Sequence, residues 1–187
     1  MKKTYYYDNG YKKCEGNLEN GKMFGKWKWW YINGQKSHEV EDIKGRIPEG
    51  FEMEWFENGQ KKFEGTFKEA LPQGVCTSWF RNGQIYLRFN FRNGMSHGKW
   101  EEWYKNGQKK YIKFYKNGEL DGNDIKWYKN GQKKSETFWK DGEVDGKEIE
   151  WYKNGQKKSE TFWKDGIICG KWKKWYKNGQ KKFELVC

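Results

Sequence analysis

The sequence is poor in the residues from which most catalytic and metal sites are built. Its 187 residues include only two histidines, His38 and His97, which lie far apart along the chain. None of the four cysteines belongs to a C-x-x-C pair, so neither a metal site nor a disulfide framework is indicated. A His-based triad or zinc cluster is therefore not expected, and no cofactor or metal is predicted.

Long apolar segments are also lacking. Met1 is followed directly by two lysines, and no run approaches the length of a membrane-spanning segment. There is no phosphate-binding G-x-x-x-x-G-K-[ST] loop, and no window has the period of an amphipathic helix. These absences predict a cytoplasmic protein that does not insert into membranes and is not an enzyme.

One short unit fills the chain instead. The stretch WYKNGQKKSETFWKDG occurs at residues 127–142 and again at 151–166. Eight Asn-Gly pairs recur every 24 or 25 residues, and an aromatic residue stands three positions before each of these eight. The Asn-Gly pairs begin at Asn9, Asn33, Asn58, Asn82, Asn106, Asn130, Asn154 and Asn178.

The repeats predict one continuous array over residues 1–187. Its units lie near 1–24, 25–49, 50–73, 74–97, 98–121, 122–145, 146–169 and 170–187. Each unit holds two runs rich in aromatic and β-branched residues, separated by K-N-G-Q or by K-D-G, which is the pattern of consecutive β-hairpins. The expected fold is all-β: a single-layer, twisted antiparallel β-meander of about eight hairpin repeats.

The loop length decides which side chains share a face of this sheet. Ser159, Thr161 and Trp163 alternate along a strand and would form its drier face. A three-residue Lys-Asn-Gly loop, with the glycine in a left-handed bulge, gathers the apolar residues together. We therefore predict this loop, and with it that Trp151 and Trp163 lie on one face.

The unit G-K-W-x-x-W-Y-x-N-G-Q-x-K-x-E-x-x-x-x-D-G resembles the variant class of bacterial MORN repeats over essentially the full chain. Similar arrays are often labelled antitoxins of toxin–antitoxin systems. The resemblance implies an extended antiparallel meander with a binding role. It does not identify a partner, because fold-level analogy does not supply function.

Lysines form the most regular charged feature. The formal net charge is +12, and the Asn-Gly turns of the later repeats contribute much of it. We predict a lysine stripe that could contact nucleic acid or an acidic partner, although lysines at turns also simply keep a thin sheet solvated. The stripe comprises Lys105, Lys109, Lys110, Lys129, Lys133, Lys134, Lys153, Lys157, Lys158, Lys177, Lys181 and Lys182.

Acidic residues recur beside this stripe. Glu136, Glu160 and Glu184 occupy one repeat position, each two residues after a lysine. Cross-strand ion pairing is the expected role of such a row, and a paired-carboxylate glycosidase site is a weak alternative.

Arginines are confined to one region of the chain. Arg46, Arg81, Arg88 and Arg92 are the only four, and Arg88 stands where the repeat usually has glutamate. Ala70 occupies a turn position where glycine is expected in the same region. Because arginine suits bidentate contacts to carboxylates or phosphates, we predict a partner-binding site formed by these four arginines and Tyr86, with repeat drift as the alternative.

The favoured function is a non-enzymatic interaction module that binds a protein or ribonucleoprotein and inhibits or recruits it. An antitoxin-like inhibitor follows from the resemblance, and a phage-type inhibitor of a defence nuclease, including an RNA-guided one, is an extension of that idea. The alternative is a nucleic-acid-binding protein that uses the lysine stripe. Two copies could also pair along exposed sheet edges as a homodimer.

Overall fold

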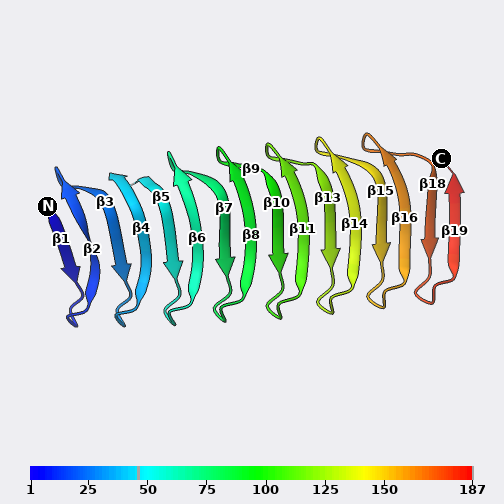
Figure 1. The fold of residues 1–187 in the computed structure, drawn as a ribbon. Coiled ribbons are helices and arrows are strands. Elements are labelled where there is room, and N and C mark those ends of the chain that lie inside the picture. Colours follow the sequence, from blue (N-terminus) through cyan, green and yellow to red (C-terminus); the bar gives the residue numbers. More distant parts are fainter. Residues whose placement is uncertain (46, 187) are drawn as a thin grey trace. The chain divides into compact units, whose positions relative to one another are not determined.

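The computed structural model describes residues 1–45 and 47–186, in which all regular secondary structure is β-strand. These residues form two compact units, which we call the N-terminal unit (Met1–Met95) and the C-terminal unit (Ser96–Cys187). Within each unit, successive strands pair antiparallel and are joined by hairpins (Figure 1). No described helix is long and apolar enough to span a membrane.

The strands follow the repeats closely. The earlier strands are β1 (Lys2–Tyr6), β2 (Lys12–Glu19), β3 (Lys22–Trp30), β4 (Lys36–Gly45), β5 (Ile47–Trp55), β6 (Lys61–Lys68), β7 (Leu71–Trp79), β8 (Ile85–Arg92) and β9 (Met95–Ser96). The later strands are β10 (Gly98–Trp103), β11 (Lys109–Lys116), β12 (Glu119–Leu120), β13 (Gly122–Trp127), β14 (Lys133–Lys140), β15 (Glu143–Trp151), β16 (Lys157–Lys164), β17 (Ile167–Ile168), β18 (Lys171–Trp175) and β19 (Lys181–Val186). The predicted antiparallel hairpin architecture is confirmed.

Each of the eight recurring Asn-Gly turns, from Asn9 to Asn178, is a three-residue loop, as predicted. In the loop between β15 and β16, Tyr152 N donates to Gln156 O at 2.8 Å and Gly155 N donates to Tyr152 O at 2.9 Å. Gly155 has a φ of +85°, in the left-handed region that costs glycine little. The same two hydrogen bonds recur in the other seven turns of this series.

The prediction that Trp151 and Trp163 share a face is wrong. The register shifts between Glu150, which pairs with Ser159, and Trp151, which pairs with Lys157. This second β-bulge adds one residue to β16 and reverses the side-chain alternation beyond it. Trp151 therefore lies on the face of Glu160, and Trp163 lies on the opposite face with Ser159.

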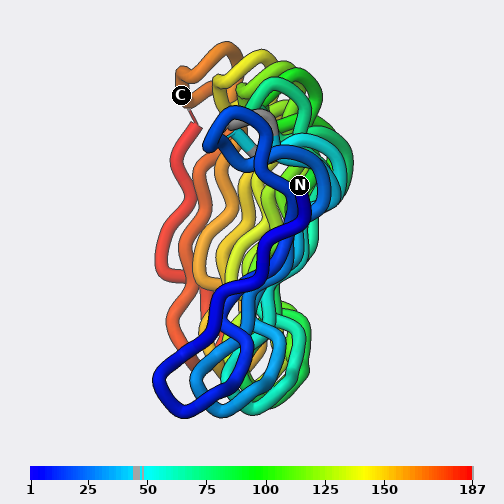
Figure 2. The backbone as a smooth tube through the Cα atoms, turned by 90° about the vertical axis from the view of Figure 1, so that its left-hand side faces the viewer, coloured from blue at the N-terminus to red at the C-terminus, as the bar shows by residue number. Residues whose placement is uncertain are grey.

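Each repeat thus has two distinct faces. We call the face of the recurring tryptophans (Trp30, Trp55, Trp79, Trp103, Trp127, Trp151 and Trp175) the tryptophan face. The opposite face, which carries Tyr152 and its counterparts, is the tyrosine face. Figure 2 shows the layer from its side, and within each unit no described helix or second sheet covers either face.

In the N-terminal unit the tyrosine face carries the apolar core. Trp27 has no exposed surface and packs with Cys14, Val40 and Ile43. Its indole donates from Nε1 to Asn17 O at 3.0 Å and lies against Gly16, where a Cβ atom would overlap the ring. The missing side chain of Gly16 is therefore what lets a tryptophan lie flat on a single-layer sheet.

In the C-terminal unit the same face is buried but polar. Ser135, Thr137, Ser159 and Thr161 are all less than a tenth exposed. Ser159 Oγ donates to Glu150 Oε2 at 3.0 Å, so a hydrogen bond satisfies this buried hydroxyl. Short polar side chains replace here the large apolar groups of the N-terminal unit.

Candidate protein-interaction surface

Ion pairs cover much of the tryptophan face. Glu160 is 8% exposed and accepts from Lys157 at 2.6 Å, while Lys147 lies 3.2 Å from its other oxygen. Glu39 is held in the same way by Lys36 and Lys26, both at 2.6 Å. The predicted ion-paired row is thus present. Within a strand, each glutamate pairs with the lysine three residues before it, because the β-bulge changes which lysine shares its face.

These pairs determine the protonation of the glutamates. Burial alone would raise the pKa of Glu160, but hydrogen bonds from Lys157 and Lys147 outweigh it, so the pKa lies below its ordinary value. The pKa of Glu39 is lowered in the same way by Lys26 and Lys36. Both carboxylates are therefore ionised and paired at neutral pH, which is unsuitable for general acid catalysis.

The lysine stripe is divided between the two faces. Lys157 pairs with Glu160 on the tryptophan face, whereas Lys158 pairs with Glu150 at 2.9 Å on the tyrosine face. Further members of the stripe are also ion-paired, namely Lys109 with Glu101, Lys110 with Glu102, Lys133 with Glu136 and Lys181 with Glu184. These carboxylates reduce the positive charge that the stripe can offer to phosphates.

The remaining members of the stripe lie in the hairpin loops or, for Lys134 and Lys182, at the second positions of β14 and β19. Ammonium groups lie 5.4–6.0 Å from tyrosine ring centroids for Lys129 over Tyr104, Lys134 over Tyr128 and Lys182 over Tyr176. Lys105, Lys153 and Lys177 are exposed loop residues. The stripe is therefore a row of hairpin ends rather than one focused groove.

The predicted arginine site is spread over three locations. Arg88 and Arg92 are exposed on the tryptophan face of β8, because Arg88 pairs with Thr77 and Arg92 follows at an alternate position. Arg81 lies in the loop before β8, with its guanidinium carbon 5.6 Å from the Phe56 ring centroid. Tyr86 lies on the tyrosine face, 4.9 Å from Phe80 between ring centroids. Arg46 lies outside the described residues.

Exposed apolar side chains accompany Arg88 and Arg92. Phe51 of β5 is 38% exposed, and Leu71 and Val75 of β7 are 48% and 56% exposed. All three point to the tryptophan face, and Val75 pairs with Asn90, between the two arginines. We call Phe51, Leu71, Val75, Arg88 and Arg92 the β5–β8 patch. Exposed apolar groups beside arginines are typical of protein-binding surfaces.

The sequence analysis missed the apolar half of this patch, although the repeat contained the signal. Phe51 and Val75 stand at the repeat position occupied by Lys99 and Lys147 in later units. Leu71 stands where two later units have Glu119 and Glu143, whereas Met95 and Ile167 keep an apolar residue there. Comparison of repeat positions would have revealed the charged-to-apolar change at Phe51 and Val75.

The repeat architecture agrees with a known family. The MORN repeat variant family matches residues 49–69, 72–93, 96–117, 144–165 and 168–186, which together make up more than half of the chain. The chain belongs to this family. MORN repeats are generally non-catalytic interaction modules, which is compatible with a binding role.

Two further observations concern this MORN protein. No curated protein matches the chain. Within residues 1–45 and 47–186, no group of three or more His, Cys, Asp or Glu side chains is placed to hold a metal ion. The β5–β8 patch is therefore the candidate site that the described geometry supports best.

Proposed function

We propose that this MORN protein is a binding module that contacts a protein partner through the β5–β8 patch. The supporting observation is the exposure of Phe51, Leu71 and Val75 on the face of β5–β8 that also carries Arg88 and Arg92, with Val75 directly between the two arginines. Burying these apolar groups against a partner provides affinity, and the arginines favour acidic residues around the contact. Inhibition, as in an antitoxin-like protein, and recruitment both require such a contact.

Neighbouring parts of the same face do not offer this combination. In the C-terminal unit, the row that includes Glu160 binds its own lysines. Phe138 and Phe162 are exposed on the same face, but this part of the sequence contains no arginine. A partner that binds there must either break these ion pairs, which costs desolvation energy, or leave them exposed to water, where they contribute little. In both cases the gain in affinity is small. The proposal therefore assigns binding to the N-terminal unit.

Affinity capture with matched variants tests the proposal. The tagged wild-type chain, Val75→Lys and Phe138→Lys are each incubated with host lysate, with and without nuclease, and retained proteins are quantified by mass spectrometry. Val75→Lys introduces the residue that later repeats carry at this position, and Phe138 is a comparably exposed apolar residue of the C-terminal unit.

We expect one protein that survives nuclease treatment, is retained by the wild type and Phe138→Lys, and is lost with Val75→Lys. Equal retention by all three chains would contradict the assignment to the patch. Capture that disappears with nuclease would instead support nucleic-acid binding by the lysine stripe.

A further inference from the structure

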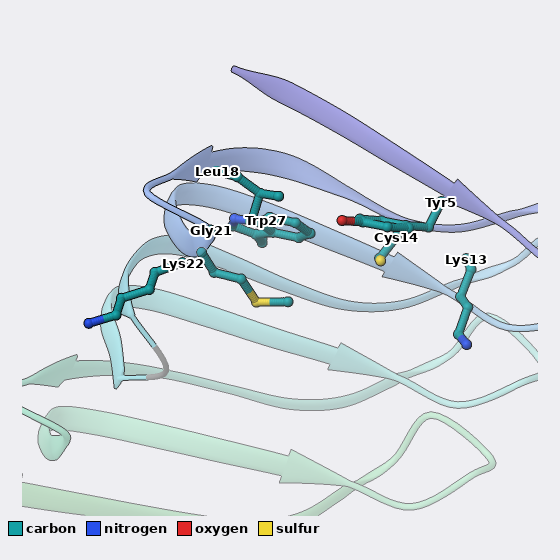
Figure 3. A pocket seen from close by; sticks show the side chains of 8 residues that line it. Tyr5, Lys13, Cys14, Leu18, Gly21, Lys22 and Trp27 are labelled. Carbon is teal, nitrogen blue, oxygen red and sulfur yellow. The ribbon is translucent and has the colours of Figure 1, made fainter.

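A second feature lies on the opposite face, in the first strands of the N-terminal unit. Figure 3 shows a hollow between β1, β2 and β3 that Tyr5, Cys14, Leu18 and Met23 line. Its volume is about 730 Å³, within the range typical of small-molecule sites. Trp27 lies beneath these residues and has no accessible surface of its own.

The hollow follows from local sequence. Gly16 lets the Trp27 indole lie flat against the sheet, and Gly21, which lines the hollow, contributes no side chain to it. Tyr5 is 45% exposed although its ring borders an apolar surface. An apolar wall is therefore available to a ligand without any rearrangement of the core.

The charges at the rim define the ligand. Lys13 and Lys22 stand at opposite ends of the hollow, and their ammonium groups point away from it (Figure 3). Lys13 Nζ lies 5.7 Å from the Tyr7 ring centroid. Within the part of the chain that the structure describes, neither lysine forms an ion pair, in contrast to Lys12 and Lys26, which are bound by Glu15 and Glu39. A lysine side chain is long and flexible, so either ammonium group, having no carboxylate partner among the described residues, can turn toward the hollow. An apolar hollow with such groups beside it is complementary to an anion that has an apolar body.

We propose that this hollow binds a small amphipathic organic anion, with a ring or short-chain body against Tyr5, Leu18 and Met23 and a carboxylate or sulfonate at Lys13 or Lys22. The site is independent of the β5–β8 patch, because it lies on the tyrosine face of β1–β3. Either assignment can fail without affecting the other.

The test uses two fluorescent probes of similar shape and different charge on the full chain. The anionic probe is 8-anilinonaphthalene-1-sulfonate, and the neutral probe is N-phenyl-1-naphthylamine. Lys13→Gln and Lys22→Gln are compared with Lys134→Gln, which alters the same repeat position as Lys13 where no such hollow is described. Alkylation of Cys14 and of the exposed Cys169 by iodoacetamide is followed by peptide mass spectrometry.

We expect one saturable sulfonate site, weakened about two- to five-fold by each rim substitution and unchanged by Lys134→Gln. Binding of the neutral probe should not respond to the lysine substitutions. The bound sulfonate should slow alkylation of Cys14 and not of Cys169. Sulfonate affinity that is unchanged in both rim variants, or Cys14 alkylation that is unaffected at saturation, would overturn the proposal.

Discussion

The two units use the same repeat to build different tyrosine faces. In the N-terminal unit, Trp27, Val40 and Cys14 form an apolar core on this face. In the C-terminal unit, Thr137 and Ser159 occupy the equivalent strands and are buried with hydrogen bonds to glutamates. A hairpin repeat thus tolerates either an apolar or a polar tyrosine face. Its geometry is defined by the turns and by the hydrogen bonds between strands rather than by a thick core.

Replacing the core tryptophan should reveal the largest difference in stability between the two units. Trp27→Ala truncates a core tryptophan that has no exposed surface, and should destabilise the chain by about 3–5 kcal/mol. Trp172→Ala alters the same repeat position in the C-terminal unit, where the ring is half-buried, and should cost less. Guanidinium denaturation followed by fluorescence measures both effects, and equal losses would remove the distinction between the units.

Two neighbouring repeats of the C-terminal unit differ by one methylene. Glu148 Oε2 accepts from Trp163 Nε1 at 2.9 Å, whereas Asp124 and Trp139 at the equivalent positions leave Asp124 Oδ1 and Trp139 Nε1 buried and unpaired. The shorter carboxylate does not reach the indole. Asp124→Glu should therefore stabilise the chain by about 1–2 kcal/mol in the same denaturation assay.

The reverse substitution, Glu148→Asp, is the matched control and should destabilise the chain by a comparable amount. If both substitutions shifted the denaturation midpoint in the same direction, the hydrogen bond to the indole would not be the cause.

A turn of the N-terminal unit departs from the repeat at Ala70. Glu69 and Ala70 have φ values of +53° and +63°, where the later turn has Asp165 and Gly166. Ala70→Gly should stabilise the chain by about 1 kcal/mol, because the left-handed conformation is unfavourable for alanine. Gly166→Ala should have the opposite effect, and thermal unfolding measures both. A lower melting temperature for Ala70→Gly would contradict this explanation.

The ion-paired glutamates are a feature that both units share. Glu39→Gln and Glu160→Gln should each cost under about 1 kcal/mol at pH 7. Because the folded-state pKa values are lowered, the stabilisation is complete above the unfolded pKa of about 4.3 and is lost as pH falls through the folded values. Each variant should converge with the wild type in acid, and a difference that persists below both pKa values would exclude the ion pair as its source.

Much of the fold could be predicted because the repeat specifies it locally. The Lys153-Asn154-Gly155 loop follows from the left-handed preference of glycine, and it forms as expected. The second bulge at Lys158 has no comparable sequence signal, so the face assigned to Trp151 was wrong. A bulge depends on pairing across two strands, which one strand's sequence does not reveal.

The candidate site could be predicted only in part. Arg88 and Arg92 stand out from a repeat that otherwise uses lysine, and they do share a face. Phe51 and Val75 were missed because apolar residues at alternate strand positions resemble core residues until the register shows which face they occupy. Their exposure depends on the absence of a covering layer, a property of the tertiary structure.

The most direct test of the central claim is the ratio of partner retained by Val75→Lys and by Phe138→Lys, each relative to the wild type, in nuclease-treated lysate. If the β5–β8 patch binds the partner, Val75→Lys should retain less than about one tenth of the wild-type amount, as for loss of a central apolar contact, and Phe138→Lys should match the wild type. Full retention by Val75→Lys, or loss confined to Phe138→Lys, would contradict the account.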